Sequence, residues 1–362
     1  MLAIKTDPAR SRNSKTSIYL RNHRTQISTE DLVIFESLND IMKNIKQISL
    51  FGVVIVVVAL VLYLQYSPRT DFKDAEVELI ILGTIQDAGS PHIACMKDCC
   101  RNIFLRPVTD RKVVSLGVLD HQNKKSYLFE ATPDMPSQLK HLKSCASWEA
   151  KETPQGVFLT HAHIGHYSGL MYFGKEAMNA SEVKVYAMPR MRSFLQQNGP
   201  WSLLVENNNI SLSDLNHNTE IELSENLGIT PIEVPHRDEF SETVGYRIEG
   251  PNRSALFIPD IDKWSKWNLD LETVISTVDF AFIDGTFYDG VEINHRDISQ
   301  IPHPFIIETL ELLSDIPDSE KEKVHFIHFN HTNPVLNEES GVEAEIEDAG
   351  FKVAKYGARI AL

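Results

Sequence analysis

The sequence predicts an α/β (α+β) fold in which two β-sheets carry helices on their outer faces, preceded by a single transmembrane helix. Short β-branched segments occur in the first half of the chain and again in the second, with helical segments between them. One long uncharged apolar segment lies near the N-terminus. Two groups of strands with intervening helices are typical of sheets that pack together under covering helices.

Length and composition exclude several classes of protein. The 362 residues, 42% of them hydrophobic, suffice for one large domain or two ordinary ones. Charged residues make up 23% and no segment is of low complexity, which excludes a disordered or fibrous chain. Four cysteines are too few for a disulfide framework. The net charge of −15 argues against nucleic acid as the main partner.

The apolar segment Ile48–Leu64 predicts a membrane anchor. Its 17 residues carry no charge and would form a helix about 26 Å long, near the thickness of a hydrocarbon core. The alternatives are a buried core helix or a cleaved signal peptide. We expect a tail over 1–47, a transmembrane anchor over 48–66 and a stalk over 67–76. The basic residues of the tail favour a cytoplasmic N-terminus and therefore an extracytoplasmic C-terminal domain.

The remaining residues, 77–362, show neither a linker nor a repeat and predict one domain. Its expected helices are Pro136–Cys145, Arg190–Gln197, Leu269–Thr277 and Pro304–Ile316. Its expected strands are Val77–Leu82, Val113–Val118, Ser126–Glu130, Gly156–Thr160, Val183–Ala187, Thr230–Val234, Val244–Glu249, Ala255–Ile258, Phe280–Ile283 and Val324–Phe329.

The strongest motif places His161, His163 and His166 directly after one of these strands. Three imidazoles within six residues can surround one point, and neutral imidazole is the commonest protein ligand for zinc and similar ions. Surface histidines are the alternative interpretation.

Four further polar residues stand at strand ends: His236, Asp260, Asp284 and His328. Each alone could be a helix cap, a turn residue or a histidine satisfied by hydrogen bonds. Their shared placement instead predicts that they converge on one edge of a sheet.

Six segments together carry a family resemblance: LFEATPDMPSQL, VFLTHAHIGHYSGLMYFG, VPHRDEFSETVGYRIEG, LFIPDIDKW, FIDGTFYD and FIHFNHTNP. They resemble the metallo-β-lactamase fold superfamily, and within it the pyrroloquinoline quinone biosynthesis protein B family, which is close to ribonuclease Z and the phosphodiesterases of this fold. The resemblance extends over Val77 to Leu362. It implies a four-layer αβ/βα sandwich with metals at one sheet edge.

The resemblance also implies roles for individual residues. His161, His163 and His236 would ligate a first metal, Asp260 would bridge, and His166 and His328 would complete a second site. Asp284, His303 and His331 would support the ligands or transfer protons. The implied cofactor is zinc, as one or two ions, with iron or manganese as alternatives.

Gly165 departs from the pattern of the fold, His-x-His-x-Asp-His, at the Asp position. The missing carboxylate implies a second site that is weaker or empty. An open, histidine-rich site would also accept Fe(II), whose chemistry is redox.

A second cluster, His92, Cys95, Cys99 and Cys100, follows the first strand. Relatives carry a structural zinc in this region, so these four side chains could form a closed four-coordinate site. A disulfide or buried free thiols are the alternatives.

These observations leave three functions open. The first is a membrane-anchored hydrolase whose metal-activated water attacks an ester, phosphodiester or amide of a small-molecule or peptide-derived substrate. The second, implied by the resemblance, is an iron-dependent oxidative enzyme of quinone-cofactor maturation. The third is a non-catalytic binding or carrier protein of the same fold. The sequence determines neither the substrate nor the oligomeric state.

Overall fold

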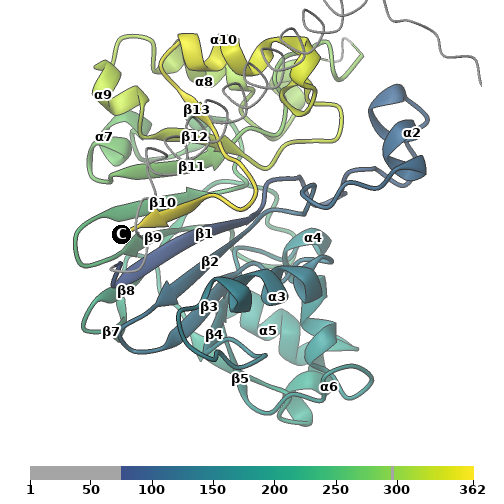
Figure 1. Cartoon of the computed structure of the whole chain (residues 1–362), viewed down its shortest axis with the longest axis vertical. Helices are drawn as coiled ribbons and strands as arrows, with labels where there is room; N and C mark the ends of the chain where they lie inside the picture. The colour runs from purple at the N-terminus through teal and green to yellow at the C-terminus, as the bar shows by residue number, and fades with distance from the viewer. Residues whose placement is uncertain (1–74, 295–296) are drawn as a thin grey trace, which may run out of the picture. The chain divides into compact units, whose positions relative to one another are not determined.

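Two seven-stranded β-sheets pack face to face in the computed structural model, which describes residues 75–294 and 297–362 (Figure 1). The first sheet has the order β14-β1-β2-β3-β4-β5-β6 and the second β13-β12-β11-β10-β9-β8-β7. The strands of the first are β1 (Val77–Gly83), β2 (Ser115–Asp120), β3 (Lys125–Phe129), β4 (Gly156–Phe158), β5 (Val183–Ala187), β6 (Ile210–Asp214) and β14 (Arg359–Ala361). Those of the second are β7 (Ile221–Ser224), β8 (Leu227–Glu233), β9 (Val244–Glu249), β10 (Ser254–Ile258), β11 (Phe280–Asp284), β12 (Val324–Ile327) and β13 (Lys352–Val353).

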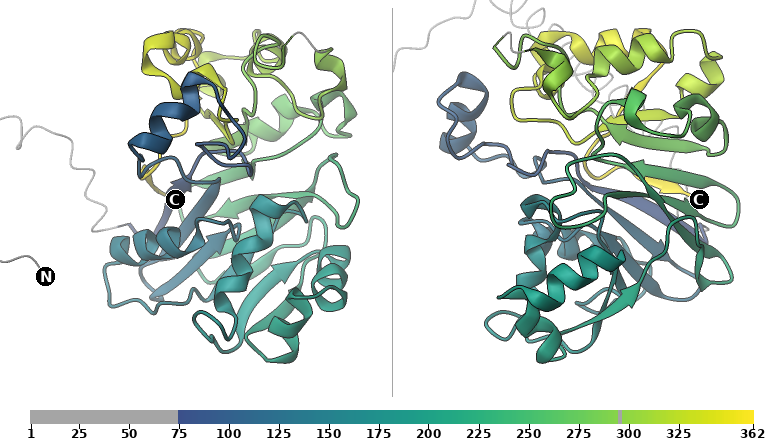
Figure 2. Two further views of the ribbon diagram at one scale, coloured as in Figure 1. Left: turned by 90° about the vertical axis from the view of Figure 1, so that its right-hand side faces the viewer. Right: turned by 180° about the vertical axis from the view of Figure 1, so that it is seen from behind.

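Helices cover the outer face of each sheet (Figures 1 and 2). The first sheet carries α3 (Met135–Cys145), α4 (Ile164–Tyr167), α5 (Pro189–Gln197) and α6 (Trp201–Glu206), together with the 3-10 helix η2 (Ser168–Phe173). The second carries α7 (Leu271–Ser276), α8 (Ile306–Leu312), α9 (Asp318–Lys321) and α10 (Val342–Asp348). Helix α2 (Asp98–Leu105) lies outside these layers, at the end of the loop that follows β1 (Figure 1).

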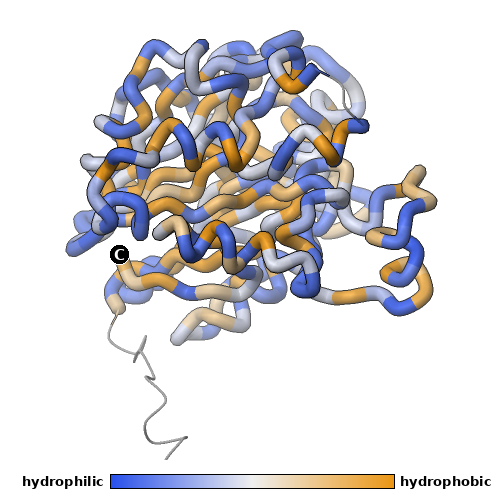
Figure 3. Tube along the Cα trace, turned by 90° about the horizontal axis from the view of Figure 1, so that it is seen from above, coloured by the Kyte–Doolittle hydropathy of each residue, from blue (hydrophilic) through white to orange (hydrophobic). Residues whose placement is uncertain are grey.

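Three apolar cores hold the four layers together, because alternate residues of each central strand point to opposite faces. In β1, Leu79 and Ile81 enter the core between the sheets, whereas Ile80 and Leu82 enter the core under the helices of the first sheet. The third core lies between the second sheet and its helices. Figure 3 shows the apolar strands enclosed by more hydrophilic outer segments. The predicted arrangement of two sheets under helices is therefore confirmed.

The predicted strands and helices match observed ones, with shifts of up to four residues at their ends. Val183–Ala187 and Val244–Glu249 agree at both ends with β5 and β9. The sequence analysis missed β6, β7, β13 and β14, which are short, edge or weakly apolar strands, and the helices α2, α4, α6, α9 and α10. The predicted helix Pro304–Ile316 is shorter in the structure, since α8 ends at Leu312.

The predicted tail over 1–47, the anchor over 48–66 and most of the stalk over 67–76 lie outside the described residues. Among the residues that the structure does describe, no helix is long and apolar enough to cross a membrane.

Candidate metal centre

The candidate residues meet where parallel strands of both sheets end. In the first sheet β1 and β3 run in one direction with β4, and in the second β8 runs in one direction with β10, β11 and β12. Carboxyl ends of parallel strands lie at one edge, which is where open α/β sheets place their ligand sites. The residues at these ends are Glu130, His161, His236, Asp260, Asp284 and His328.

Asp260 lies at the centre of a first group of ligand atoms. Its Oδ2 is 3.2 Å from His236 Nε2 and 3.4 Å from His161 Nε2. His163 turns Nδ1 inward, 2.8 Å from His161 Nε2. One ligand atom from each of these four residues falls within 4.8 Å of the others. Three separate parts of the sequence, which hold His161 with His163, His236 and Asp260, thus supply a compact N₃O donor set.

The second group shares Asp260 with the first. Ligand atoms of Asp260, Asp284, His303 and His328 also lie within 4.8 Å of one another. His166 adjoins both groups, because its Nε2 is 3.8 Å from Asp260 Oδ2 and its ring centroid is 5.5 Å from that of His328. Five of the six predicted ligands thus fall within the two groups and His166 lies beside them, whereas the second group also contains Asp284 and His303, which the sequence predicted as supporting residues.

Both carboxylate oxygens of Asp284 already accept hydrogen bonds from neighbouring residues. Its Oδ1 accepts from the backbone and the hydroxyl of Thr286, at 2.8 Å and 2.6 Å. Its Oδ2 accepts from the Ile261 amide at 3.2 Å and lies 2.9 Å from His303 Nδ1. Both oxygens of Asp284 therefore face neighbouring donors, and its role as a supporting residue stays a prediction.

Three side chains that the sequence analysis did not select fix the histidine rings. Thr160 Oγ1 lies 2.8 Å from His161 Nδ1, and Thr286 Oγ1 lies 2.8 Å from His328 Nδ1. Glu130 Oε1 lies 3.5 Å from His166 Nδ1. Such partners on the outer nitrogen set the tautomer and orientation of metal-ligating imidazoles. The only signal for them in the sequence is their position at a strand end.

Two of these strand ends use an unusual backbone conformation. Glu130 has φ 74° and His328 has φ 70°, and both side chains are fully buried. A left-handed conformation in a residue other than glycine costs of the order of 1–3 kcal/mol, and such residues cluster at functional sites. The strained backbone of Glu130 and His328 therefore lies at the same strand ends as the candidate ligands.

Hydrogen bonds across the sandwich hold the histidine motif in register. The Ala162 amide donates to Ser241 Oγ at 2.8 Å, and the Val244 amide donates to Thr160 O at 3.1 Å. The Tyr246 hydroxyl donates to Leu159 O. Because Ser241 and Tyr246 belong to the second sheet and its loops, the motif on the first sheet is tied directly to the facing layer.

Burial and neighbouring charges shift the pKa values of the histidines in opposite directions. Burial lowers the pKa of His161 and of His328 well below the usual range. It acts in the same direction on His166, but the Glu130 carboxylate outweighs it and raises the pKa of His166 to about 9. For His303, burial is outweighed by Asp284 and Asp260, so its pKa is also about 9. Burial disfavours the charged form of Asp260 as well, yet His236 and His303 hold its pKa well below the usual range.

The buried polar atoms of this centre fit a metal ion. Nε2 of His236 and of His328, and Oδ1 of Asp260, are buried and make no hydrogen bond to any described residue. An unsatisfied buried polar atom typically costs about 1–3 kcal/mol. Neutral imidazole nitrogens with one carboxylate are a donor set that zinc and other divalent transition metals accept.

The structure places His331 and the cysteine segment together, apart from the two ligand groups. The His331 ring stacks on His92 with the centroids 4.5 Å apart, and burial lowers the pKa of His331 to about 4. Cys99 Sγ lies 3.8 Å from Cys95 Sγ and 3.9 Å from Cys100 Sγ. All four cysteines are free thiols. Of the predicted four-residue site, the structure groups the three sulfurs, whereas His92 Nδ1 accepts from the Ala94 amide at 3.2 Å.

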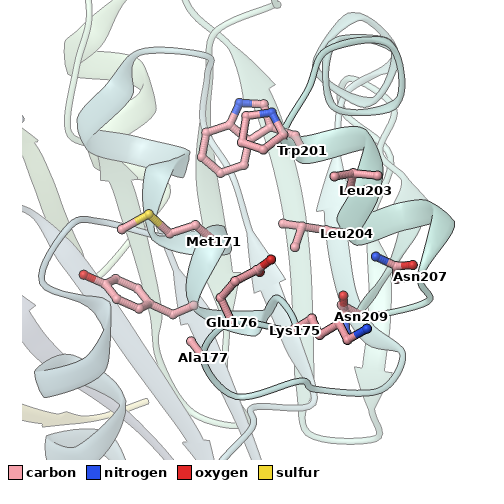
Figure 4. A pocket seen from close by; sticks show the side chains of 11 residues that line it. Met171, Lys175, Glu176, Ala177, Trp201, Leu203, Leu204, Asn207 and Asn209 are labelled. Carbon is pink, nitrogen blue, oxygen red and sulfur yellow. The ribbon is translucent and has the colours of Figure 1, made fainter.

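A pocket of 420 Å³ lies elsewhere on the first sheet's helical layer, between η2 and α6. Figure 4 shows Met171 and Glu176 on one side of it and Leu203 and Leu204 on the other. Its lining includes none of the candidate ligands, so this pocket is separate from the histidine and aspartate groups.

Glu292 is a partly buried carboxylate outside the ligand groups. Its Oε1 accepts from the Tyr288 amide at 2.5 Å and its Oε2 from the Thr332 hydroxyl at 3.0 Å. Burial raises the pKa of Glu292 from 4.5 to about 7, so this group titrates near neutral pH.

Comparison with known proteins agrees with this architecture. A family model described as a beta-lactamase superfamily domain matches residues 125–329. The coenzyme PQQ synthesis protein B of Nitrosococcus oceani is 26% identical over 314 residues, which cover 78% of this chain and 99% of that protein. The corresponding protein of Methylococcus capsulatus is 24% identical over 313 residues, with 78% and 99% covered.

Two solved structures share the fold. Zn(2+)-bound PqqB from Methylobacterium extorquens superposes with a TM-score of 0.65 at 22% identity, covering 79% of this chain and all of that one. A diphosphatase of the PhnP family gives a TM-score of 0.56 at 20% identity, with 78% and 96% covered. The match of more than half of the chain to the family model, together with the two-sheet sandwich, shows that this chain belongs to the beta-lactamase superfamily and has the metallo-β-lactamase fold.

Proposed function

We propose that the chain is a membrane-anchored, metal-dependent hydrolase acting on an ester, phosphodiester or amide bond of a small-molecule or peptide-derived substrate. The observation that carries this proposal is the position of Asp260, whose carboxylate is shared by two groups of converging imidazoles and carboxylates. Members of the superfamily include a diphosphatase with a similar fold, which is consistent with hydrolytic chemistry.

His161, His163, His236 and Asp260 would hold a first ion, and Asp260, His166 and His328 would hold a second. Zinc is the ion we propose, because imidazole-rich sets favour it and a related protein is described as Zn(2+)-bound. Iron and manganese are the alternatives. When bound, a divalent metal supplies Lewis acidity, which polarises a carbonyl or phosphoryl oxygen and lowers the pKa of water.

The residues around the ligands prepare the site for proton transfer. His303 Nδ1 is within hydrogen-bond distance of Asp284 Oδ2, at 2.9 Å, and forms an ion pair with Asp260 Oδ1, at 3.2 Å, so Nδ1 carries a proton. The His303 side chain keeps 11% exposure, whereas those of Asp260 and Asp284 keep 4% and 0%. We propose that His303 donates or accepts the proton that moves during bond cleavage, and that Asp284 orients it.

The proposal is tested with the purified full chain, prepared without chelators. It predicts bound zinc or a similar metal, together with hydrolysis of at least one ester, phosphodiester or amide substrate that chelation abolishes. His303→Gln should lower turnover by about 10²–10⁴-fold, the usual contribution of a general acid or base, while leaving the metal content unchanged. A metal-free chain, or a His303→Gln variant with full turnover, would count against these roles.

The membrane anchor over 48–66 and the extracytoplasmic location of the domain are proposals from the sequence alone. They predict that the full chain stays in the membrane fraction after an alkaline carbonate wash. A chain without residues 1–66 should appear in the soluble fraction. Release of the full chain by the wash would contradict the anchor.

A second candidate function is iron-dependent oxidation in the maturation of a quinone cofactor. The relatives named as coenzyme PQQ synthesis protein B, which this chain matches over almost their whole length, favour it. Anaerobic reconstitution with Fe(II), followed by oxygen-electrode measurements, separates the two candidates. Substrate-dependent oxygen uptake would support oxidation, and its absence alongside metal-dependent hydrolysis would support the first proposal.

A further inference from the structure

The volume beside Gly165 is already filled by another part of the chain. A Cβ atom added to Gly165 would lie 1.9 Å from Asp87 Cβ, 2.4 Å from Asp87 Cα and 3.0 Å from Asp87 O. Non-bonded atoms do not approach each other as closely as the two shorter distances. The Cβ of Asp87 therefore takes the place of a side chain at position 165, which is the position where the family pattern has its aspartate.

Backbone hydrogen bonds hold the segment that carries Asp87. It follows β1, and the Gln86 amide donates to Phe329 O at 2.9 Å, while the Phe329 amide donates to Thr84 O at 2.7 Å. Phe329 directly follows His328, and Gly165 directly precedes His166. Asp87 thus lies beside Gly165 and close to Phe329, the residues next in sequence to His166 and His328. These two histidines belong to the second metal position.

The side chain of Asp87 is partly buried. The Gln86 side-chain amide donates to Asp87 Oδ1 and orients the carboxylate.

We propose that Asp87 supplies the second metal position with the carboxylate that position 165 lacks. This inference rests on the proposed metal-dependent function and adds a ligand to it from the loop after β1. The two positions are sterically exclusive: a side chain at 165 cannot coexist with Asp87, and glycine at 165 makes room for it. The second site would then have four ligands: the imidazoles of His166 and His328 and the carboxylates of Asp260 and Asp87. It would have as many carboxylates as the family pattern, although position 165 is glycine.

The test compares zinc binding by the purified full chain and its Asp87→Asn variant. Each protein is stripped with a chelator, dialysed, titrated with zinc chloride and analysed for bound zinc per chain. Asp87→Asn keeps the shape of the side chain and removes its charge. Asp110→Asn, a change of the same kind at an exposed residue, is the control, and Asp87→Glu tests whether a carboxylate restores binding. The cysteine cluster contributes equally to all four proteins.

We expect Asp87→Asn to bind one zinc ion fewer than the wild type, or to bind the last ion at least about tenfold more weakly. Asp110→Asn should match the wild type, and Asp87→Glu should recover part of the lost affinity. Equal zinc number and affinity in the wild type and Asp87→Asn, with circular dichroism showing both folded, would overturn the role of Asp87 alone. A wild type that binds no zinc would instead remove the metal-dependent function on which it rests.

Discussion

Replacing Gly165 by alanine adds a single methyl group at a point where the backbone of Asp87 already lies. An alanine in place of a helical glycine normally stabilises a protein by roughly 0.5–1 kcal/mol. Here the new atom would stand 1.9 Å and 2.4 Å from Cβ and Cα of Asp87, neither of which can rotate away. The two effects therefore have opposite signs, and the structure decides between them.

The expected result is a net destabilisation. Adding a methyl group to a closely packed site costs about 1–3 kcal/mol, and the upper part of that range applies when backbone must move. After the helix-propensity gain, the expected loss is about 2 kcal/mol, which for a domain of this size is a fall in Tm of roughly 3 °C. Since the Asp87 loop must shift, zinc binding should weaken as well.

Thermal unfolding of the full chain, followed by circular dichroism in excess chelator, measures this change. The control is Gly290→Ala, where the one described atom that an added Cβ would approach closely is the Cγ2 methyl group of Ile298, a side-chain atom, at 3.1 Å. That variant should stay within about 0.5 kcal/mol of the wild type. If Gly165→Ala melted at or above the wild-type temperature, the close approach of the Asp87 backbone to α4 would be wrong.

Two further substitutions test carboxylates outside the ligand set. The folded-state pKa of Glu292 is raised above its ordinary 4.5 to about 7, so this group favours folding below pH 4.5 and that stability is lost as the pH rises through 7. The free energy of unfolding of Glu292→Gln, measured relative to that of the wild type, should therefore rise by up to about 3 kcal/mol between about pH 5 and about pH 8. A difference between the two proteins that does not change with pH would refute the raised pKa of Glu292. Glu130→Gln should weaken zinc binding by about 10–100-fold in a competition titration with a chromogenic chelator, and unchanged affinity would show that Glu130 does not support His166.

The order of strands and histidines along the sequence was enough to predict the fold. Central strands such as β10, in which Ala255, Leu256, Phe257 and Ile258 are all buried, point apolar side chains to both faces and therefore read as continuous apolar segments. The missed β6 reads ISLSD, and only Ile210 in it is buried. The missed α10 buries only Val342 and Ile346. Such elements form because neighbours supply their packing and hydrogen bonds, and a single sequence does not show those neighbours.

The candidate ligands could be found in the same way, because histidine and aspartate directly after a strand are chemically conspicuous. Glu130, Thr160 and Thr286 were missed because glutamate and threonine at a strand end are common, and only the ring nitrogens facing them reveal a role. Asp87 was missed for a different reason. Its importance lies in a contact with Gly165 across the fold, and no local pattern encodes that contact.

The shared position of Asp260 between the two ligand groups is tested most directly by counting bound metal in the wild type and in Asp260→Ala. The full chains are purified without chelators and analysed by elemental mass spectrometry, with His331→Ala as the control because His331 stacks on His92 instead. We predict that the wild type and His331→Ala retain the same metal content and that Asp260→Ala loses the metal bound by both groups. A metal-free wild type, or an Asp260→Ala variant that keeps its full metal content, would contradict the account.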